Sequence, residues 1–160
     1  FEFLNLAQMF IKNKKIQFIM IGDGILKKEC QQFINERRLN NVSLIGFVNQ
    51  TQLKKYYQKS DLLIVPSYYE TWGLVINEAF ASNIPVICSE NCGASKDLIL
   101  NGKTGFTYPT NELKILYTKT NKILKNKSLS NKFRTNISRK IKDYDVGISA
   151  NSILKILDEK

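Results

Sequence analysis

Short apolar runs alternate along the chain with segments in which apolar residues recur every three or four positions. The runs have the length and the β-branched and aromatic content of buried strands. They predict strands over 16–21, 42–48, 61–66, 86–88 and 106–108. The segments between them predict helices over 1–11, 26–39, 53–57 and 72–82, and residues 111–160 are expected to be mostly helical.

This alternation predicts an α/β fold with one doubly wound parallel sheet that extends from residue 1 to about residue 108. Strands as continuously apolar as these are buried on both faces, so we expect helices on both sides of the sheet. Asn83, followed two residues later by Pro85, predicts a left-handed cap that ends the helix over 72–82. The first residues show a helical apolar face without a capping residue, so we expect the chain to begin inside a helix.

Length and composition bound the class of protein. The 160 residues, 43% hydrophobic and 24% charged, are enough for a single domain with a continuous core. Lys, Glu, Asn or Asp interrupts every apolar run before it reaches the ~20 residues of a membrane-spanning helix, so we expect a soluble domain. The sequence has no histidine, which excludes Ser-His-Asp triads and histidine metal sites.

The cysteines and the acidic residues bear on location and metals. Cys30, Cys88 and Cys92 lack CxxC spacing, which favours reduced thiols in the cytoplasm over a disulfide framework or a zinc site. No paired Asp ends a predicted strand, so we expect turnover that needs no divalent metal. The Asp143-Tyr-Asp145 triplet resembles a metal-binding DxD motif but follows a basic helix, and we interpret it as a loop or a cap.

The charge is strongly positive. The 24 Lys and Arg residues against 14 Asp and Glu give +10, which favours acidic partners. Ten of these basic residues lie within 114–142, which contains no acidic residue, and a solvated helical face is the simplest interpretation of that segment. The functional alternative is peripheral contact with an anionic membrane at its inner face. We prefer it to nucleic acid, because only two of the ten are Arg and no nucleic-acid-binding signature is present.

Candidate chemistry gathers where the predicted strands end, because ligands of open α/β sheets bind at the carboxyl ends of the strands. The segments at these ends are 22–24, 46–49, 67–74 and 89–94, and the third is the richest. Backbone N–H groups at the start of the following helix suit a phosphate. They belong to Trp72, Gly73, Leu74 and Val75, and Gly73 lets a ligand approach closely because it lacks a Cβ.

Two carboxylates flank this helix start. Glu78 lies among apolar residues of its own helix, and a ribose diol would supply two donors to it. Glu70 precedes the helix and could accept a sugar hydroxyl or stabilise positive charge in a reacting ring. Alternatively, Glu70 only complements the helix dipole and Glu78 pairs with a surface Lys. Spacing alone leaves both interpretations open. It also leaves open whether Trp72 and the Tyr68-Tyr69 pair stack on a sugar or base or pack within the protein.

Several motifs in one order resemble a known family. They are Gly22-Asp23-Gly24, Pro66-Ser67, Glu70, Trp72-Gly73-Leu74, Glu78-Ala79, Pro85-Val86-Ile87, Asn101-Gly102 and Gly105-Phe106. Together they resemble the carboxy-terminal, donor-binding half of the GT-B fold, family 4 type retaining glycosyltransferases, over about 16–106. The resemblance implies a Rossmann-like sheet and a donor-binding half that moves a sugar from a nucleotide-diphosphate sugar to a glycan or lipid-linked acceptor, with retention of configuration.

The resemblance also implies roles for individual residues. In that family the first Glu of an E-x7-E motif contacts the donor sugar and the second binds the ribose, which implies these roles for Glu70 and Glu78. Val48 would contact the base. The backbone at Thr71, Trp72, Gly73, Leu74 and Val75 would bind the sugar and the diphosphate.

Two departures from the family pattern matter. Asn83 stands where members often have Gly, and Asn is the next-best residue for a left-handed cap. The basic pair that grips the diphosphate in that family would lie before Phe1, and the acceptor-binding amino-terminal lobe is outside this chain, so we do not expect the chain to catalyse by itself. A dinucleotide-binding oxidoreductase is disfavoured because Lys27 occupies the third glycine position. A non-catalytic nucleotide-binding or protein-interaction module is the alternative to an enzyme.

Overall fold

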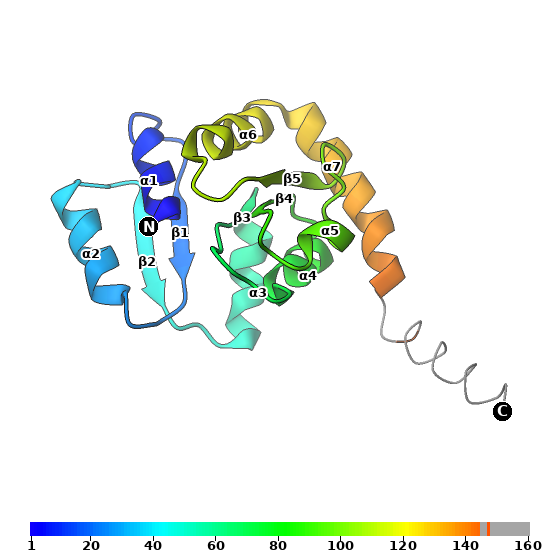
Figure 1. Cartoon of the computed structure of the whole chain (residues 1–160), viewed down its shortest axis with the longest axis horizontal. Helices are drawn as coiled ribbons and strands as arrows, with labels where there is room; N and C mark the ends of the chain where they lie inside the picture. The colour runs from blue at the N-terminus through cyan, green and yellow to red at the C-terminus, as the bar shows by residue number, and fades with distance from the viewer. Residues whose placement is uncertain (145–146, 148–160) are drawn as a thin grey trace, which may run out of the picture.

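Strands and helices alternate in the computed structural model, which describes residues 1–144 and Gly147 (Figure 1). The strands are β1 (Phe18–Ile21), β2 (Val42–Gly46), β3 (Leu63–Val65), β4 (Val86–Ser89) and β5 (Gly105–Tyr108). The helices are α1 (Glu2–Met9), α2 (Lys27–Glu36), α3 (Gln50–Lys59), α4 (Leu74–Ala81), α5 (Ser95–Leu98), α6 (Leu113–Lys125) and α7 (Lys127–Lys140), followed by a 3-10 turn, η1 (Ile141–Tyr144).

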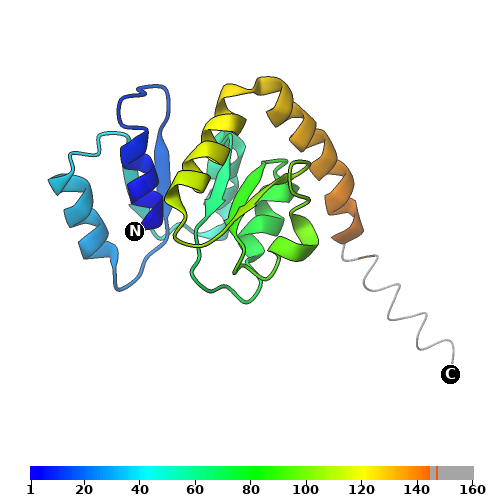
Figure 2. The ribbon, with the colours of Figure 1, turned by 45° about the horizontal axis from the view of Figure 1, so that its top comes forward.

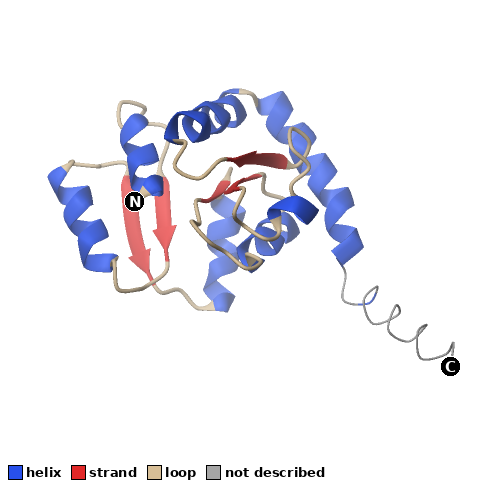
Figure 3. Cartoon of the chain, in the orientation of Figure 1, coloured by secondary structure: helices blue, strands red, loops and turns tan. Residues whose placement is uncertain are grey.

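The order of elements follows the apolar pattern, and Figure 3 shows the α/β alternation that it predicted. The short helix α5 was not expected from the sequence. Asn83 adopts a left-handed conformation with φ of 60°, so the prediction of an Asn cap after α4 is confirmed. Of the segment expected to be mostly helical, α6, α7 and η1 cover 113–144 almost completely, and 145–146 and 148–160 lie outside the described residues.

The prediction of one continuous sheet is wrong for the described residues. The strands are parallel but form two separate ladders, β1 with β2 and β3–β4–β5. The two ladders meet through side chains, because Phe18 of β1 lies in the same hydrophobic cluster as Leu62 and Ile64 around β3. An apolar run predicts a strand but does not specify which backbone the strand pairs with.

Helices cover both faces of the β3–β5 ladder. Val86 and Cys88 pack in the cluster that includes Ile76 and Phe80 of α4. Ile87 between them packs on the other side, in the cluster that includes Leu116 of α6. Successive residues of a strand point to opposite faces, so β4 is buried from both sides, as its continuous apolar run predicted.

The β1–β2 ladder is covered less completely. Met20 and Leu44 pack with α1 and α2 in a third cluster, whereas Ile19 and Ile45 on the opposite face are each 41% exposed. The expectation that every strand is buried on both faces is therefore wrong for β1 and β2. Figure 2 shows the two groups, with α1 and α2 beside β1–β2 and α4, α6 and α7 around β3–β5.

Candidate functional site

The loop between β3 and α4 is held against the loop that follows β4. Ser89 Oγ donates a hydrogen bond to the carbonyl oxygen of Ser67, and Asn91 Nδ2 donates one of 3.0 Å to that of Tyr68. The amide of Gly93 donates to the carbonyl oxygen of Glu70 at 2.9 Å. Backbone and side-chain bonds thus hold most of the loop that carries Glu70, and the carboxyl ends of neighbouring parallel strands bring the two loops together.

Gly93 makes this close approach possible. A Cβ on Gly93 would lie 1.9 Å from the carbonyl oxygen of Thr71, so any larger residue must push the two loops apart. The next amide, that of Ala94, donates a 2.8 Å hydrogen bond to the carbonyl oxygen of Trp72. Gly93 could not be singled out from the sequence, because its partner Thr71 lies more than twenty residues away in the chain.

Gly73 has two structural reasons to be glycine. Its φ is +95°, a left-handed backbone conformation that residues with a side chain rarely adopt, and an added Cβ would lie 2.7 Å from Sγ of Cys92. Burial raises the pKa of the Cys92 thiol, which donates a 3.1 Å hydrogen bond to the carbonyl oxygen of Trp72. Gly73 therefore packs tightly on its inner side, and the first turn of α4 begins directly after it.

The start of α4 presents a group of unused backbone donors. Among the described residues, the amides of Gly73, Leu74 and Val75 donate no hydrogen bond, and the side chain of Leu74 is 69% exposed. The amide of Trp72 was predicted to be free but donates to Oε1 of Glu70 at 3.4 Å. Three neighbouring N–H groups at the positive end of a helix favour an anion such as a phosphate.

Glu70 lies directly before this helix start and is half-buried. Its backbone is paired on both sides of the Cα, because its amide donates to the carbonyl oxygen of Asn91 and its carbonyl oxygen accepts from Gly93. Its carboxylate accepts the Trp72 amide, which is the contact expected of a residue that complements the helix dipole. The same geometry holds a negative charge next to the three free amides.

Glu78 lies one turn into α4 and is also half-buried. Its Oε2 accepts a 2.9 Å hydrogen bond from the hydroxyl of Tyr57 on α3, and no ion pair of the described residues includes it. The proposed pairing with a surface Lys is therefore wrong, and the expectation that this carboxylate must find a donor is confirmed. Burial and the contact with Glu78 raise the pKa of Tyr57 well above its usual range, so the phenol keeps the proton that it donates.

The aromatic residues of the loop divide into two kinds. Trp72 packs against the cluster around α4, and its Nε1 donates to Oδ1 of Asn77 at 3.0 Å, so packing is the correct interpretation for Trp72. Tyr68 and Tyr69 are 73% and 79% exposed, so packing is wrong for them. The sequence could not separate these aromatics, because all three lie beside the same strand end.

The loops after β1 and β2 meet at the corresponding edge of the first ladder. The amide of Gly22 donates to the carbonyl oxygen of Gly46, and Lys27 Nζ forms a 2.6 Å ion pair with Asp23. This hydrogen bond from Lys27 lowers the pKa of the exposed Asp23 carboxyl. Val48 is half-buried in the short link between β2 and α3. Asn49 caps α3, because its Oδ1 accepts a hydrogen bond from the amide of Gln52.

The roles of several predicted site residues stay predictions. Thr71 is exposed beside Glu70, Val48 lies in the link between β2 and α3, and the prediction that Glu70 and Glu78 line one cleft stays a prediction. Asp143 lies in η1 and pairs with Lys140 at 4.0 Å, while Asp145 is outside the described residues. Within the described part of the chain, no three His, Cys, Asp or Glu side chains gather as metal ligands, and no helix has the length and hydropathy to cross a membrane.

Comparison with known proteins gives a consistent result. A family model described as glycosyl transferases group 1 matches residues 2–140. The alpha-monoglucosyldiacylglycerol synthase of Acholeplasma laidlawii is 31% identical over 97 residues, which cover 60% of this chain and 24% of that protein. The alpha-D-kanosaminyltransferase of Streptomyces kanamyceticus is 29% identical over 104 residues, which cover 64% of this chain and 27% of that enzyme. The chain thus spans about a quarter of the length of these two relatives.

Two solved structures share the fold. The S. aureus protein TarM, in complex with Fondaparinux, alpha-GlcNAc-glycerol and UDP, aligns with a TM-score of 0.85 at 24% identity, over 96% of this chain and 31% of that one. Alr3699/HepE of Anabaena, in complex with UDP-glucose, aligns with a TM-score of 0.84 at 21% identity, over 99% of this chain and 44% of that one. At these identities the similarity shows the fold alone.

Proposed function

The chain belongs to the glycosyl transferases group 1 family and has the Rossmann-like α/β fold of the carboxy-terminal half of a GT-B glycosyltransferase, and on this premise we propose that it binds the donor of a sugar transfer. The donor is a nucleotide-diphosphate sugar. The transferred group is a hexose, the acceptor is a glycan or a lipid-linked molecule, and the anomeric configuration is retained, as expected of family 4 type enzymes. Catalysis uses the complete protein, because the acceptor is bound by the other lobe.

One observation carries this proposal. Three neighbouring amides, those of Gly73, Leu74 and Val75, have no partner among the described residues and lie at the positive end of α4. A half-buried carboxylate lies on each side of them, Glu70 before the helix and Glu78 one turn into it. An anion flanked by hydroxyl-bearing groups matches this order of donors and acceptors, and a sugar diphosphate joined to a ribose is such a ligand.

Each site residue then has its own role in the transfer. As the bond between the anomeric carbon and the phosphate oxygen breaks, negative charge grows on the diphosphate and positive charge grows on the sugar ring. The three amides donate to the phosphate oxygens, and Glu70 accepts a sugar hydroxyl and stabilises the ring. Glu78 binds the ribose, and Val48 and Thr71 complete the contacts to the base and the sugar. The amides and the helix dipole stabilise the diphosphate, so turnover needs no metal and a chelator leaves it unchanged.

The relatives support the donor class and leave the acceptor broad. The UDP and UDP-glucose bound in the two solved structures support a uridine nucleotide as the first donor to test. The relatives' names are those of an alpha-monoglucosyldiacylglycerol synthase and an alpha-D-kanosaminyltransferase, so they do not single out one acceptor class.

The test removes one amide donor, and a matched control accounts for the loss of the leucine side chain. Leu74 is the first residue of α4, a position at which proline is favoured because its missing N–H has no partner within the helix. In the full-length protein, Leu74→Pro should weaken UDP binding roughly 10- to 150-fold, the loss of one charge-assisted hydrogen bond of about 1.5 to 3 kcal/mol. Leu74→Ala keeps the amide and should bind UDP as the wild type does, with calorimetry as the measurement for both.

The outcomes separate the proposal from its alternative. Equal UDP affinity in Leu74→Pro and Leu74→Ala would contradict phosphate binding at this helix start. UDP binding that depends on the Leu74 amide, without turnover of any nucleotide sugar by the complete protein, would instead favour the non-catalytic nucleotide-binding module.

We propose a cytoplasmic location, at the inner face of a membrane. The cysteines at 30, 88 and 92 are free thiols in the structure, which fits a reducing compartment. Fractionation of cells that express the full-length protein tests this, with the cytoplasmic and peripheral-membrane fractions as the expected positions.

A further inference from the structure

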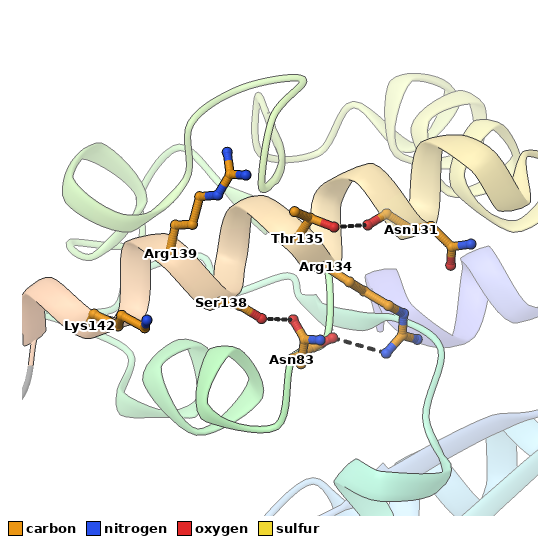
Figure 4. Close-up of a pocket in the computed structure, with 7 residues that line it drawn as sticks. All are labelled: Asn83, Asn131, Arg134, Thr135, Ser138, Arg139 and Lys142. Carbon is orange, nitrogen blue, oxygen red and sulfur yellow. Dashed lines mark hydrogen bonds between the residues drawn. The ribbon is translucent and has the colours of Figure 1, made fainter.

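Two hollows flank α7 and share the side chain of Arg139. The first, about 480 Å³, lies between α7 and the end of α4 and is lined by Asn83, Asn131, Arg134, Thr135, Ser138, Arg139 and Lys142 (Figure 4). The second, about 380 Å³, is lined by Leu100, Lys103, Asn136, Arg139, Lys140 and Asp143. Segments from three distant parts of the chain therefore form one polar surface around α7, which we call the α7 surface.

Hydrogen bonds hold the walls of both hollows. Arg134 donates to the carbonyl oxygen of Asn83 at 2.9 Å, and Ser138 Oγ donates to Oδ1 of the same residue at 3.1 Å (Figure 4). On the other side, Asn136 Nδ2 donates to the carbonyl oxygen of Lys103 at 2.9 Å. The left-handed turn at Asn83 and the loop before β5 are thereby fixed against α7.

The α7 surface carries more positive charge than its carboxylates compensate. Among the described residues of the two linings, five are basic and Asp143 is the one carboxylate. Asp143 pairs with Lys140 at 4.0 Å, and Asp61, outside the linings, lies 3.8 Å from Arg134. Arg139 and Lys142 are exposed and form no ion pair with any described residue.

The surroundings extend this charge and add an apolar contact. Lys132 is exposed and lies seven residues before Arg139, on the helix face opposite the buried Phe133 and Ile137. Leu100 is 42% exposed beside Lys103 in the second hollow. Of the residues that the structure describes, no aromatic one lines either hollow, so this part of the surface lacks the stacking platforms that unpaired bases use.

We propose that the α7 surface docks on an anionic lipid bilayer. Lipid phosphates bind in the two hollows at Arg139 and Lys142, and Leu100 contacts the interfacial region. Asn83, in the first hollow, lies just past the end of α4, and the candidate phosphate site lies at its start, about 12 Å of helix away at ~1.5 Å per residue. The inference rests on the charge of the α7 surface and does not depend on nucleotide binding.

The test measures partition of the full-length protein onto vesicles of phosphatidylcholine, with and without phosphatidylglycerol. We expect binding to the anionic vesicles only, with a partition coefficient that falls as salt is added. The double variant Arg139→Gln with Lys142→Gln should lower the partition roughly thirty-fold, from about 1 kcal/mol for each basic residue near the lipid. The matched control is Lys54→Gln with Lys55→Gln, two exposed residues of α3, which should partition as the wild type does.

Three results would overturn the proposal. One is equal binding to the two kinds of vesicle. Another is an equal loss in the double variant and its control, because net charge rather than the α7 surface would then act. The third is binding of single-stranded DNA, lost in the double variant, without any vesicle binding. Unchanged affinity of the double variant for UDP shows that it folds, and the salt and lipid dependence of the wild type tests the proposal without any variant.

Discussion

The two ladders of the molecule follow the same order of strand and helix, yet they differ at the edge where their strands end. After β1, a Cβ added to Gly22 or Gly24 would meet no atom within 4 Å. After β4, a Cβ on Gly93 would lie 1.9 Å from the backbone oxygen of Thr71. The loop after β1 is thus open to solvent, and the loop after β4 is packed against the Glu70 loop.

This difference bears on where the site is built. Every residue of β4 is buried, whereas Ile19 and Ile45 of the first ladder are partly exposed. The three unused amides and both carboxylates belong to the second ladder, where the Glu70 loop is bonded to the loop after β4. Precise placement of donors and acceptors needs such support, and the open loops of the first ladder are better suited to adjust around a ligand.

The largest expected effect comes from glycine substitutions that compare the two ladders. Gly93→Ala forces the Glu70 loop away from its neighbour and should lower the free energy of unfolding of the full-length protein by about 3 kcal/mol. Gly24→Ala meets no neighbour and should change it by less than about 0.5 kcal/mol. Urea unfolding measures both, and similar values for the two variants would contradict the difference in packing.

The next effect separates the two carboxylates of the second ladder. If Glu78 binds the ribose as proposed, Glu78→Gln removes a charge-assisted contact of about 1.5 to 3 kcal/mol, so UDP affinity should fall roughly 10- to 150-fold. If Glu70 acts on the sugar as proposed, Glu70→Gln should leave UDP affinity near that of the wild type and lower kcat on the intact donor.

Calorimetry with UDP and steady-state kinetics on the full-length enzyme measure these effects. Glu36→Gln, at the exposed end of α2, controls for the loss of one carboxylate from the surface. Equal loss of UDP affinity in both site variants, or in neither, would show that the assigned roles are wrong.

A smaller effect concerns the contact that holds Glu78. Tyr57→Phe removes the 2.9 Å hydrogen bond to Oε2 of Glu78. A hydrogen bond contributes about 0.5 to 1.5 kcal/mol, so the loss of this one, which positions Glu78, should weaken UDP binding roughly two- to tenfold. Tyr56→Phe alters the neighbouring tyrosine of α3 and should bind UDP as the wild type does. If both variants bind alike, Tyr57 does not act through Glu78.

The same tyrosine should leave a signature in the pH dependence of stability. Tyr57 titrates near pH 10 in the unfolded chain and at higher pH in the folded protein, because burial and Glu78 raise its pKa. Its contribution to stability is complete below about pH 10 and is lost as the pH rises through the folded-state pKa. The free energy of unfolding should therefore fall more steeply above pH 10 in the wild type than in Tyr57→Phe.

Much of the fold was predictable because it depends on short-range patterns. The apolar runs located all five strands, and Asn83 marked the end of α4 through its own tolerance of a left-handed conformation. The helix start that carries the candidate site was predictable in the same way, since Glu70, Gly73 and Glu78 lie within nine residues around one strand end and one helix start. Their spacing in the chain already places them at one edge of a parallel sheet.

The features that the sequence did not predict depend on pairs of groups far apart in the chain. Tyr57 reaches Glu78 from another helix, Gly93 is required by the carbonyl oxygen of Thr71, and the break between the two ladders depends on how β1 packs beside β3. Local periodicity specifies which face of an element is apolar. It carries no information on which backbone or hydroxyl will lie opposite, because that is decided only when the whole core packs.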